Sequence, residues 1–362
     1  MKRRDYATAC IVFVVLTLGT GQGLVAQDAL KGKKLIEWGW DEPDTRSIRQ
    51  NVRKMEQMPF DGLVFHVAGS KSGNFVWEMW GGRRFELAEF QGAINDLKAT
   101  PFQRLTDRFL RVNVTPGKVD WYDDQAWAVV LQNSTVAAQI AKQGGCKGFM
   151  FDVEQYEGQL FNYGKQKHRD SKSFAEYQAK VRQRGREWMK AVGGQFPEIT
   201  ILLTFGYSIT GGLPKNRAGA SYGLLADFLD GMLDACSPRT RIVDAWEGAY
   251  TYKRKDQFRK AYDTIKVKSA EWSGAGEKYR RVQAGFGIWM DCNWRKAGWH
   301  VDDFAKNHFT PAEFEAAVRS ALEVSDEYVW IYTEQPRWWT SEQLPTAYID
   351  ALRNARAKPK GQ

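Results

Sequence analysis

The sequence predicts an α/β protein made of a single closed barrel of eight parallel strands, the (β/α)8 or TIM barrel, with long βα loops. Two observations predict it. Eight apolar runs rich in β-branched or aromatic residues recur along the chain, at residues 34–40, 62–67, 109–114, 148–154, 200–207, 241–246, 282–290 and 328–334. Polar stretches of helical character lie between them, and strands that alternate with helices favour a parallel sheet that closes on itself.

The helical stretches have periodic apolar positions and recognisable start signals. They are predicted at residues 47–58, 125–143, 173–192, 222–235, 256–269, 311–324 and 341–356. Thr310 precedes Pro311 and Glu313, which is the pattern of a capped helix start. An open doubly wound sheet is the rival fold, but it needs a Gly-rich phosphate turn after its first strand. Here residues 37–43 read EWGWDEP, so the barrel is favoured.

The first residues predict a secretory signal peptide at 1–26. Residues 2–4 are basic, residues 9–19 form an uncharged and mostly apolar run, and the LVA sequence at 24–26 fits a cleavage site. The apolar run is shorter than the about 20 residues that a membrane span needs. We therefore expect an exported protein, periplasmic or extracellular. It would have no membrane span after cleavage and one catalytic barrel domain at residues 30–358.

Charge and cysteine content narrow the expected partners. The formal net charge is +9, and loss of residues 2–5 with the signal peptide would remove +2 and leave +7. The basic residues are scattered, which fits either ordinary solubility or binding of an anionic, sulfated or uronic-acid polysaccharide. Nucleic acid is not expected as a partner of an exported chain. The three cysteines that follow the predicted signal peptide, Cys146, Cys236 and Cys292, are odd in number and widely spaced, so no disulfide framework or cysteine metal site is predicted.

Residues 148–156, with the sequence GFMFDVEQY, carry the strongest functional signal. They read as an apolar strand that ends in two acids, Asp152 and Glu154. Residues two apart in a strand point to the same face, so the two carboxylates would lie side by side. Burying paired acids is costly unless they are used or neutralised. Carboxylates in unequal environments are what cleavage of a glycosidic bond requires.

The other strand ends carry a similar concentration of polar and aromatic residues, and active sites of barrels lie at that end. The opposite strand ends look ordinary. The substrate contacts that this asymmetry predicts are Glu37, Trp40, His66, Asn113, Tyr156, Tyr207, Trp246, Glu247, Trp289 and Tyr332. For each there is a structural alternative: an acid can cap the following helix, and an aromatic ring or imidazole can belong to the core.

The fourth-strand segment resembles the signature of family-18 chitinases and related (β/α)8 glycoside hydrolases, where an Asp and a Glu two residues apart are followed by a Tyr. The resemblance implies that Glu154 is the proton donor. It also implies that Asp152 supports the substrate's own acetamido group as nucleophile. The additional upstream Asp of that family falls at Met150 here, a departure that speaks against chitinase chemistry in particular. The motif spans about nine residues, and the wider likeness to secreted barrel hydrolases is architectural.

Without substrate assistance a second carboxylate is needed, as nucleophile or as base for water. The candidates are, in order of preference, Glu334, Asp291, Glu247 and Asp244. A further version makes Asp152 the nucleophile and an acid of the sixth strand the proton donor. The expected activity is therefore hydrolysis of a polysaccharide or oligosaccharide, with no cofactor or metal. The rivals are a non-catalytic carbohydrate-binding barrel and a metal-dependent hydrolase or lyase, the latter weakened by the single strand-end histidine, His66.

Overall fold

The structure, a computed structural model, describes residues 30–71, 74–293 and 298–357, and the signal peptide expected at 1–26 lies outside them. Within these ranges nine parallel strands form one sheet in the order β7-β6-β5-β4-β3-β2-β1-β9-β8. The α/β barrel prediction is confirmed. The strands are β1 (Lys34–Gly39), β2 (Gly62–Phe65), β3 (Asp107–Asn113), β4 (Gly148–Asp152), β5 (Thr200–Leu203), β6 (Arg241–Asp244), β7 (Val282–Ala284), β8 (Phe286–Trp289) and β9 (Tyr328–Thr333).

β7 and β8 together close the barrel. They are two halves of the single strand predicted at 282–290. β7 pairs with β6, whereas β8 pairs with β9. Gly285 lies between the halves, and its N–H donates to the carbonyl oxygen of Asp244 at 2.9 Å. A Cβ on Gly285 would lie 2.8 Å from the carbonyl oxygen of Tyr328, so only glycine fits. One bent strand thus serves both edges of the sheet.

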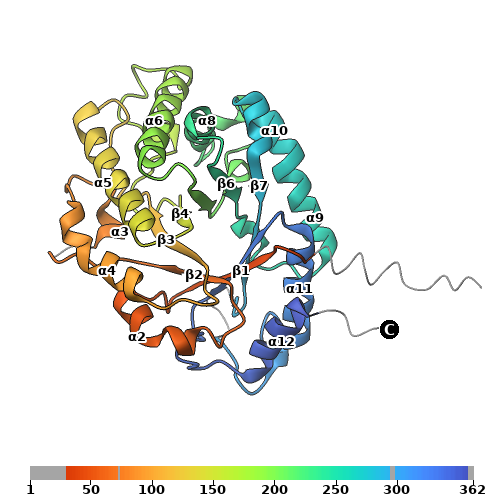
Figure 1. Cartoon of the computed structure of the whole chain (residues 1–362). Coiled ribbons are helices and arrows are strands. Elements are labelled where there is room, and N and C mark those ends of the chain that lie inside the picture. The colour runs from red at the N-terminus through yellow and green to blue at the C-terminus, as the bar shows by residue number, and fades with distance from the viewer. Residues whose placement is uncertain (1–29, 72–73, 294–297, 358–362) are drawn as a thin grey trace, which may run out of the picture.

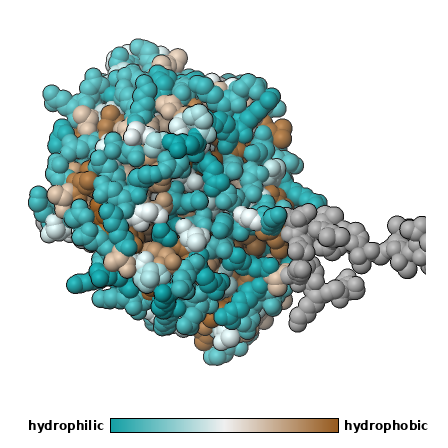
Figure 2. Space-filling view, viewed as in Figure 1, coloured by the Kyte–Doolittle hydropathy of each residue, from teal (hydrophilic) through white to brown (hydrophobic). Residues whose placement is uncertain are grey.

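Helices surround the strands in chain order (Figure 1). They are α2 (Thr45–Met55), α3 (Phe75–Glu78), α4 (Gln91–Ala99), α5 (Asp124–Gln143), α6 (Phe174–Gln195), α7 (Pro214–Arg217), α8 (Leu225–Ala235), α9 (Lys255–Asp263), α10 (Ser269–Trp272), α11 (Pro311–Val324) and α12 (Thr346–Arg356). In the described part of the chain, none of them is long and apolar enough to cross a membrane. The face in Figure 2 is mostly hydrophilic, with scattered hydrophobic residues.

Three helical regions differ from the prediction. The short helix α4 was not predicted, since only Ala93, Ile94 and Leu97 of it are buried and its apolar signal is weak. The stretch 256–269 is interrupted by a π-helical turn between α9 and α10. The last helix begins at Thr346 instead of residue 341, because Ser341 has a φ of 64° that a right-handed helix does not accept.

Side chains alternate between two cores. One core fills the barrel, with Ile36, Val64, Phe109, Met150 and Leu202 among its members. The other lies between the strands and the helices. Because the period of a strand is two, this alternation decides which polar side chains face the barrel mouth and which face the helices.

Glu37 faces away from the barrel mouth, so its predicted substrate contact is corrected. Its neighbour Trp38 belongs to the inner core, and Glu37 is fully buried on the other face of β1, beside Asp41 and Trp339. Burial raises the pKa of Glu37 well above its usual value, and Asp41 raises it further. Its surroundings therefore favour the protonated form of the Glu37 carboxyl.

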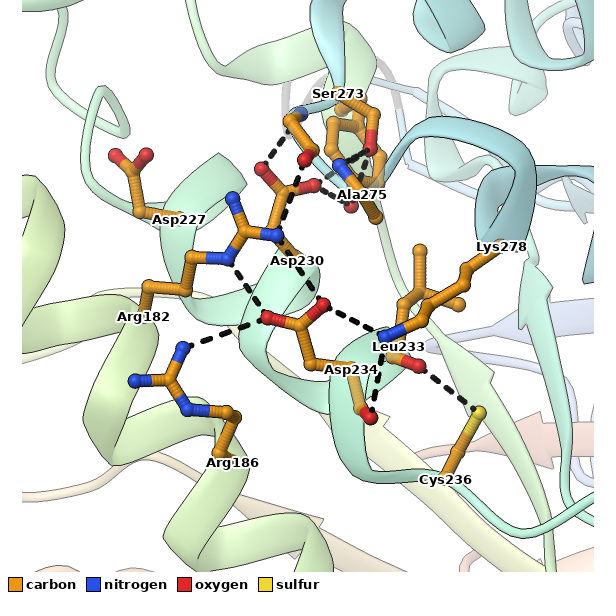
Figure 3. A network of polar contacts seen from close by, with 12 residues as sticks. Arg182, Arg186, Asp227, Asp230, Leu233, Asp234, Cys236, Ser273, Ala275 and Lys278 are labelled. Carbon is orange, nitrogen blue, oxygen red and sulfur yellow. Dashed lines mark hydrogen bonds and ion pairs between the residues drawn. The ribbon is translucent and has the colours of Figure 1, made fainter.

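Tyr207 is also structural and not a substrate contact. It is buried against the helices, and its hydroxyl donates to Oδ1 of Asp230 on α8 at 2.7 Å. Asp230 further accepts hydrogen bonds from Ser273 and the N–H of Gly274. Figure 3 shows this network continuing to Asp234, which accepts hydrogen bonds from arginines of α6.

The buried Glu37 makes stability depend on pH. Its folded pKa is raised above the unfolded value of about 4.3, so its contribution is full below that pH and is lost as the pH rises toward the folded pKa. Glu37→Gln, which cannot ionise, should gain stability relative to wild type between about pH 5 and 8, by up to about 1.4 kcal/mol per pH unit. Urea unfolding across this range measures the difference, and parallel curves for the two proteins would contradict it.

Candidate active site

A cavity of about 910 Å³ opens at the C-terminal ends of the strands. Residues at or after the end of each of the eight barrel positions reach it, which is the usual place of a barrel active site. Its lining consists of Trp38, Gly39, Trp40, Trp77, Arg111, Asp152, Glu154, Tyr156, Thr204, Phe205, Ser208, Ile209, Trp246, Glu247, Gly248, Tyr250, Thr251, Trp289, Tyr332 and Glu334.

Asp152 and Glu154 both line this cavity, and their environments differ. Asp152 is the last residue of β4 and is 1% exposed. Its Oδ1 accepts the N–H of Glu154 at 3.0 Å, and its Oδ2 accepts the hydroxyl of Tyr156 at 2.9 Å. Burial raises the pKa of Asp152 to about 6 against the opposing effect of Arg111, and Glu154 adds to the rise. Glu154 is the more accessible of the two acids.

Glu247 brings a third carboxyl group to the same place. It begins the short 3₁₀ turn Glu247–Ala249 after β6, and its N–H donates to the carbonyl oxygen of Thr204 at 2.8 Å. Burial raises the pKa of Glu247 well above its usual value, and the charges of Asp152 and Glu154 raise it further. The sequence left the direction of this loop residue open. In the structure it lines the cavity, and its surroundings favour the protonated form.

Glu334 lines the cavity from β9, and Asp291 does not, so the catalytic assignment of Asp291 is corrected. Asp291 is 2% exposed and accepts the N–H groups of Glu334 at 3.1 Å and Gln335 at 2.8 Å, together with Nε1 of Trp289 at 2.9 Å. The carboxylate of Asp291 thus accepts hydrogen bonds from the backbone that follows β9. Asp291 therefore holds Glu334 in place and faces a separate cavity of about 230 Å³. Asp244 also turns away, because its neighbour Val243 fills the inner core.

Sequence reasoning missed an ion pair in the cavity wall, between Arg111 and Glu42. Nη1 of Arg111 lies 3.1 Å from Oε2 of Glu42, which also accepts Nε1 of Trp38 at 2.8 Å. Although burial raises it, Arg111 and His66 together lower the pKa of Glu42 below its usual value. The guanidinium lies over the Trp77 ring, 4.9 Å from its centroid. Phe109 belongs to the inner core, and residues two apart in a strand share a face. The sequence could therefore have predicted that Arg111, two residues after Phe109, faces the inside of the barrel.

His66 and Asn113 lie near the site without lining it, and both predicted substrate contacts are corrected. Nδ1 of His66 lies 3.3 Å from Oε1 of Glu42, so its imidazole supports the ion pair. Asn113 is fully buried at the end of β3, and its Oδ1 accepts the N–H of Thr115 at 3.0 Å. Both residues are at strand ends as expected, but Nδ1 of His66 and Oδ1 of Asn113 contact neighbouring protein groups.

Aromatic rings form much of the cavity wall. Tyr250 and Tyr332 stack with centroids 5.5 Å apart and planes at 17°, and Trp289 meets both edge-on. Trp40 is 60% exposed, and its Nε1 donates to the Tyr332 hydroxyl at 2.9 Å. The lining includes five aromatic residues expected from the sequence: Trp40, Tyr156, Trp246, Trp289 and Tyr332. It also includes four aromatic residues that were not among the predicted substrate contacts: Trp38, Trp77, Phe205 and Tyr250.

Among the described residues, no group of three or more His, Cys, Asp or Glu side chains is arranged to hold a metal ion. The carboxyl groups of the cavity are instead surrounded by rings, one guanidinium and backbone donors. Such a set suits proton transfer and the stabilisation of positive charge on a bound molecule.

No protein-family model matches this chain, and no curated protein matches it. Solved structures match it along most of its length. The tri-modular endo-beta-1,4-glucanase B from Bacillus halodurans aligns with a TM-score of 0.50 at 11% identity, over 92% of this chain and 61% of that chain. The GH5-4 broad specificity endoglucanase from Bacteroides salanitronis has a TM-score of 0.48 at 12% identity, over 95% and 98%. At such identities the likeness concerns the fold, and the chemistry must be argued from the site.

The contacts of Asp291 predict a large stability effect. Asp291→Ala leaves the buried N–H groups of Glu334 and Gln335 without their acceptor, which should lower the free energy of unfolding by on the order of 3 kcal/mol. Asp170→Ala, at a carboxylate whose side chain is 89% exposed, is the matched control and should stay within about 0.5 kcal/mol of wild type. Denaturant unfolding measures both changes in the free energy of unfolding. Equal changes in the two variants would contradict the structural role of Asp291.

Proposed function

We propose that this protein is an exported glycoside hydrolase that cleaves a polysaccharide or oligosaccharide at the mouth of the barrel. One observation carries the proposal: Asp152, Glu154 and Glu247 meet in an aromatic-walled cavity, where burial raises the pKa of Asp152 to about 6 and the pKa of Glu247 well above its usual value. Pairs of acids with separated pKa values provide a proton donor and an ionised carboxylate in one site. Glycosidic hydrolysis needs both.

Glu247 is the proposed proton donor. Glu154 was the donor implied by the chitinase-like motif, but Glu247 is the acid whose protonated form is favoured, because burial and the charges of Asp152 and Glu154 raise its pKa well above the usual value. The Glu247 proton passes to the glycosidic oxygen as the bond between that oxygen and the sugar carbon breaks. Water supplies the hydroxyl group of the product, and its proton returns the carboxyl groups to their starting state.

Glu154 and Asp152 have different proposed roles. Glu154 is the accessible carboxylate that stabilises positive charge on the reacting carbon, directly or through the attacking water. Asp152, with both oxygens engaged by the protein, orients Tyr156 and Glu154 and contributes negative charge beneath them. Glu334 and the wall residues Trp40, Tyr156, Trp246, Trp289 and Tyr332 are proposed to hold the sugar rings.

Export and substrate charge remain predictions from the sequence. The basic, apolar and small-residue pattern of residues 1–26 supports a signal peptide and a periplasmic or extracellular location. An anionic substituent on the sugar would be met by Arg111, a cation that lines the cavity.

Replacing either proposed catalytic acid should abolish most turnover. Glu247→Gln and Glu154→Gln should each lower kcat by about 100-fold or more, since proton transfer and charge stabilisation each contribute this much. The screen is release of reducing ends from a panel of polysaccharides. Glu157→Gln, at a neighbouring acid that pairs with Lys118 outside the cavity, is the matched control. Full activity in both variants would refute the assignment.

The pH dependence of kcat/KM should be bell-shaped. Activity should rise with an apparent pKa of about 6, as Asp152 ionises, and fall at higher pH when Glu247, whose pKa is raised, loses its proton. The apparent pKa values of the two limbs describe the interacting acids of the cavity as a group and not single residues. Asp152→Asn removes one ionising group, so the acid limb should move to lower pH. An unchanged acid limb in this variant would assign that limb to another group.

A further inference from the structure

We propose that Trp40 and Tyr156 are two sugar-binding platforms on opposite sides of the cavity, and that the enzyme therefore cleaves within a glycan chain instead of removing its terminal unit. The inference rests on the proposed function and adds the substrate form, an extended chain that crosses the barrel mouth. Three features of these two rings support the inference: their exposure, the hydrogen bonds that hold them (called tethers below) and their placement in the barrel.

Exposure singles these residues out. The large hydrophobic side chains that are exposed in the described part of the chain are Trp40 at 60%, Val267 at 58%, Tyr156 at 48%, Leu213 at 43% and Val301 at 38%. The two aromatic members are also the two that line the cavity. An exposed indole or phenol ring at a cavity mouth offers a flat apolar face, which covers the C–H face of a sugar ring while its polar atom stays hydrogen-bonded.

Both rings are tethered to the acid-bearing strand ends. Nε1 of Trp40 donates to the Tyr332 hydroxyl at 2.9 Å, and that hydroxyl lies 3.4 Å from Oε1 of Glu334. The Tyr156 hydroxyl donates to Oδ2 of Asp152 at 2.9 Å, and its ring meets Trp77 edge-on with centroids 5.1 Å apart. An exposed ring held in this way loses little conformational freedom when a ligand binds.

The tethers lie across the barrel from each other. Trp40 is held by β9 and Tyr156 by β4, and the sheet order β4-β3-β2-β1-β9 separates these strands by four steps in a barrel of eight positions. A chain that contacts both rings passes over the cavity that Glu154 and Glu247 line. The volume of about 910 Å³ is at the upper end for a drug-sized ligand, so it accommodates more than one ring.

The test compares wild type with Trp40→Ala on neutral and uronic-acid polysaccharides, their oligomers of increasing length and matched aryl monoglycosides. Loss of the platform should lower kcat/KM on long oligomers by about 5- to 10-fold, a larger loss than on aryl monoglycosides. Trp40→Phe, which keeps a ring and loses the tether, should fall between. Val267→Ala, at an equally exposed side chain outside the cavity, should behave as wild type.

Product analysis tests the cleavage position. Wild type should lower the viscosity of its polysaccharide before many reducing ends appear, and it should form mixed oligomers. Exclusive release of single units, or equal loss on long and short substrates in Trp40→Ala, would overturn the proposal.

A failure of the proposed function is distinguishable, because wild type would then release no reducing ends from any member of the panel. In that case affinity electrophoresis in gels containing the same polysaccharides tests whether the two rings bind sugar, independently of catalysis. Weaker retardation of Trp40→Ala than of Val267→Ala supports them, whereas equal or absent retardation overturns them.

Discussion

The strict alternation of side chains around a closed barrel is the constraint on which the other features depend. Once Ile36 and Val243 fill the interior, Glu37 and Asp244 must face the helices, and neither can reach a ligand. The same rule directs Arg111 and Asp152 to the mouth. The alternation continues around the barrel because Gly285 lets one strand bend and pair with both β6 and β9. Pairing on both sides fixes the register of the strands.

Burial then gives chemically similar acids different properties. Asp152 keeps a carboxylate near neutrality because backbone and hydroxyl donors and Arg111 offset its desolvation. Burial desolvates Glu247, which has fewer such donors and faces two acids, so its pKa is raised and its protonated form is favoured. The carboxyl groups of Asp152 and Glu154 are thus part of what raises the pKa of Glu247. In the proposed hydrolase, donor and stabilising carboxylate are not independent parts, and a change in one alters the other.

The surrounding residues hold this arrangement by using their own charges. Asp291 accepts three N–H groups behind Glu334. Glu42 contacts His66 and anchors Arg111, which lies over the Trp77 ring. The carboxylates of Asp291 and Glu42 resemble active-site acids in a sequence, since they are charged and follow strands. They differ in that their oxygens are already engaged by the protein. Polar groups buried in this manner stiffen a site without contacting its ligand.

The sequence by itself determined the eight-position barrel and the placement of Asp152 and Glu154 at the cavity where the fourth strand ends, because periodicity and strand-end composition are local properties. It could not decide which of the remaining acids join them. Asp291 and Glu247 both follow strands, and their roles differ only because one meets free backbone N–H groups and the other meets two carboxyl groups. Arg111 and Glu42 are 69 residues apart, so their pairing exists only once β3 lies near β1. Contacts of that range are set by chain closure in space, and no local pattern encodes them.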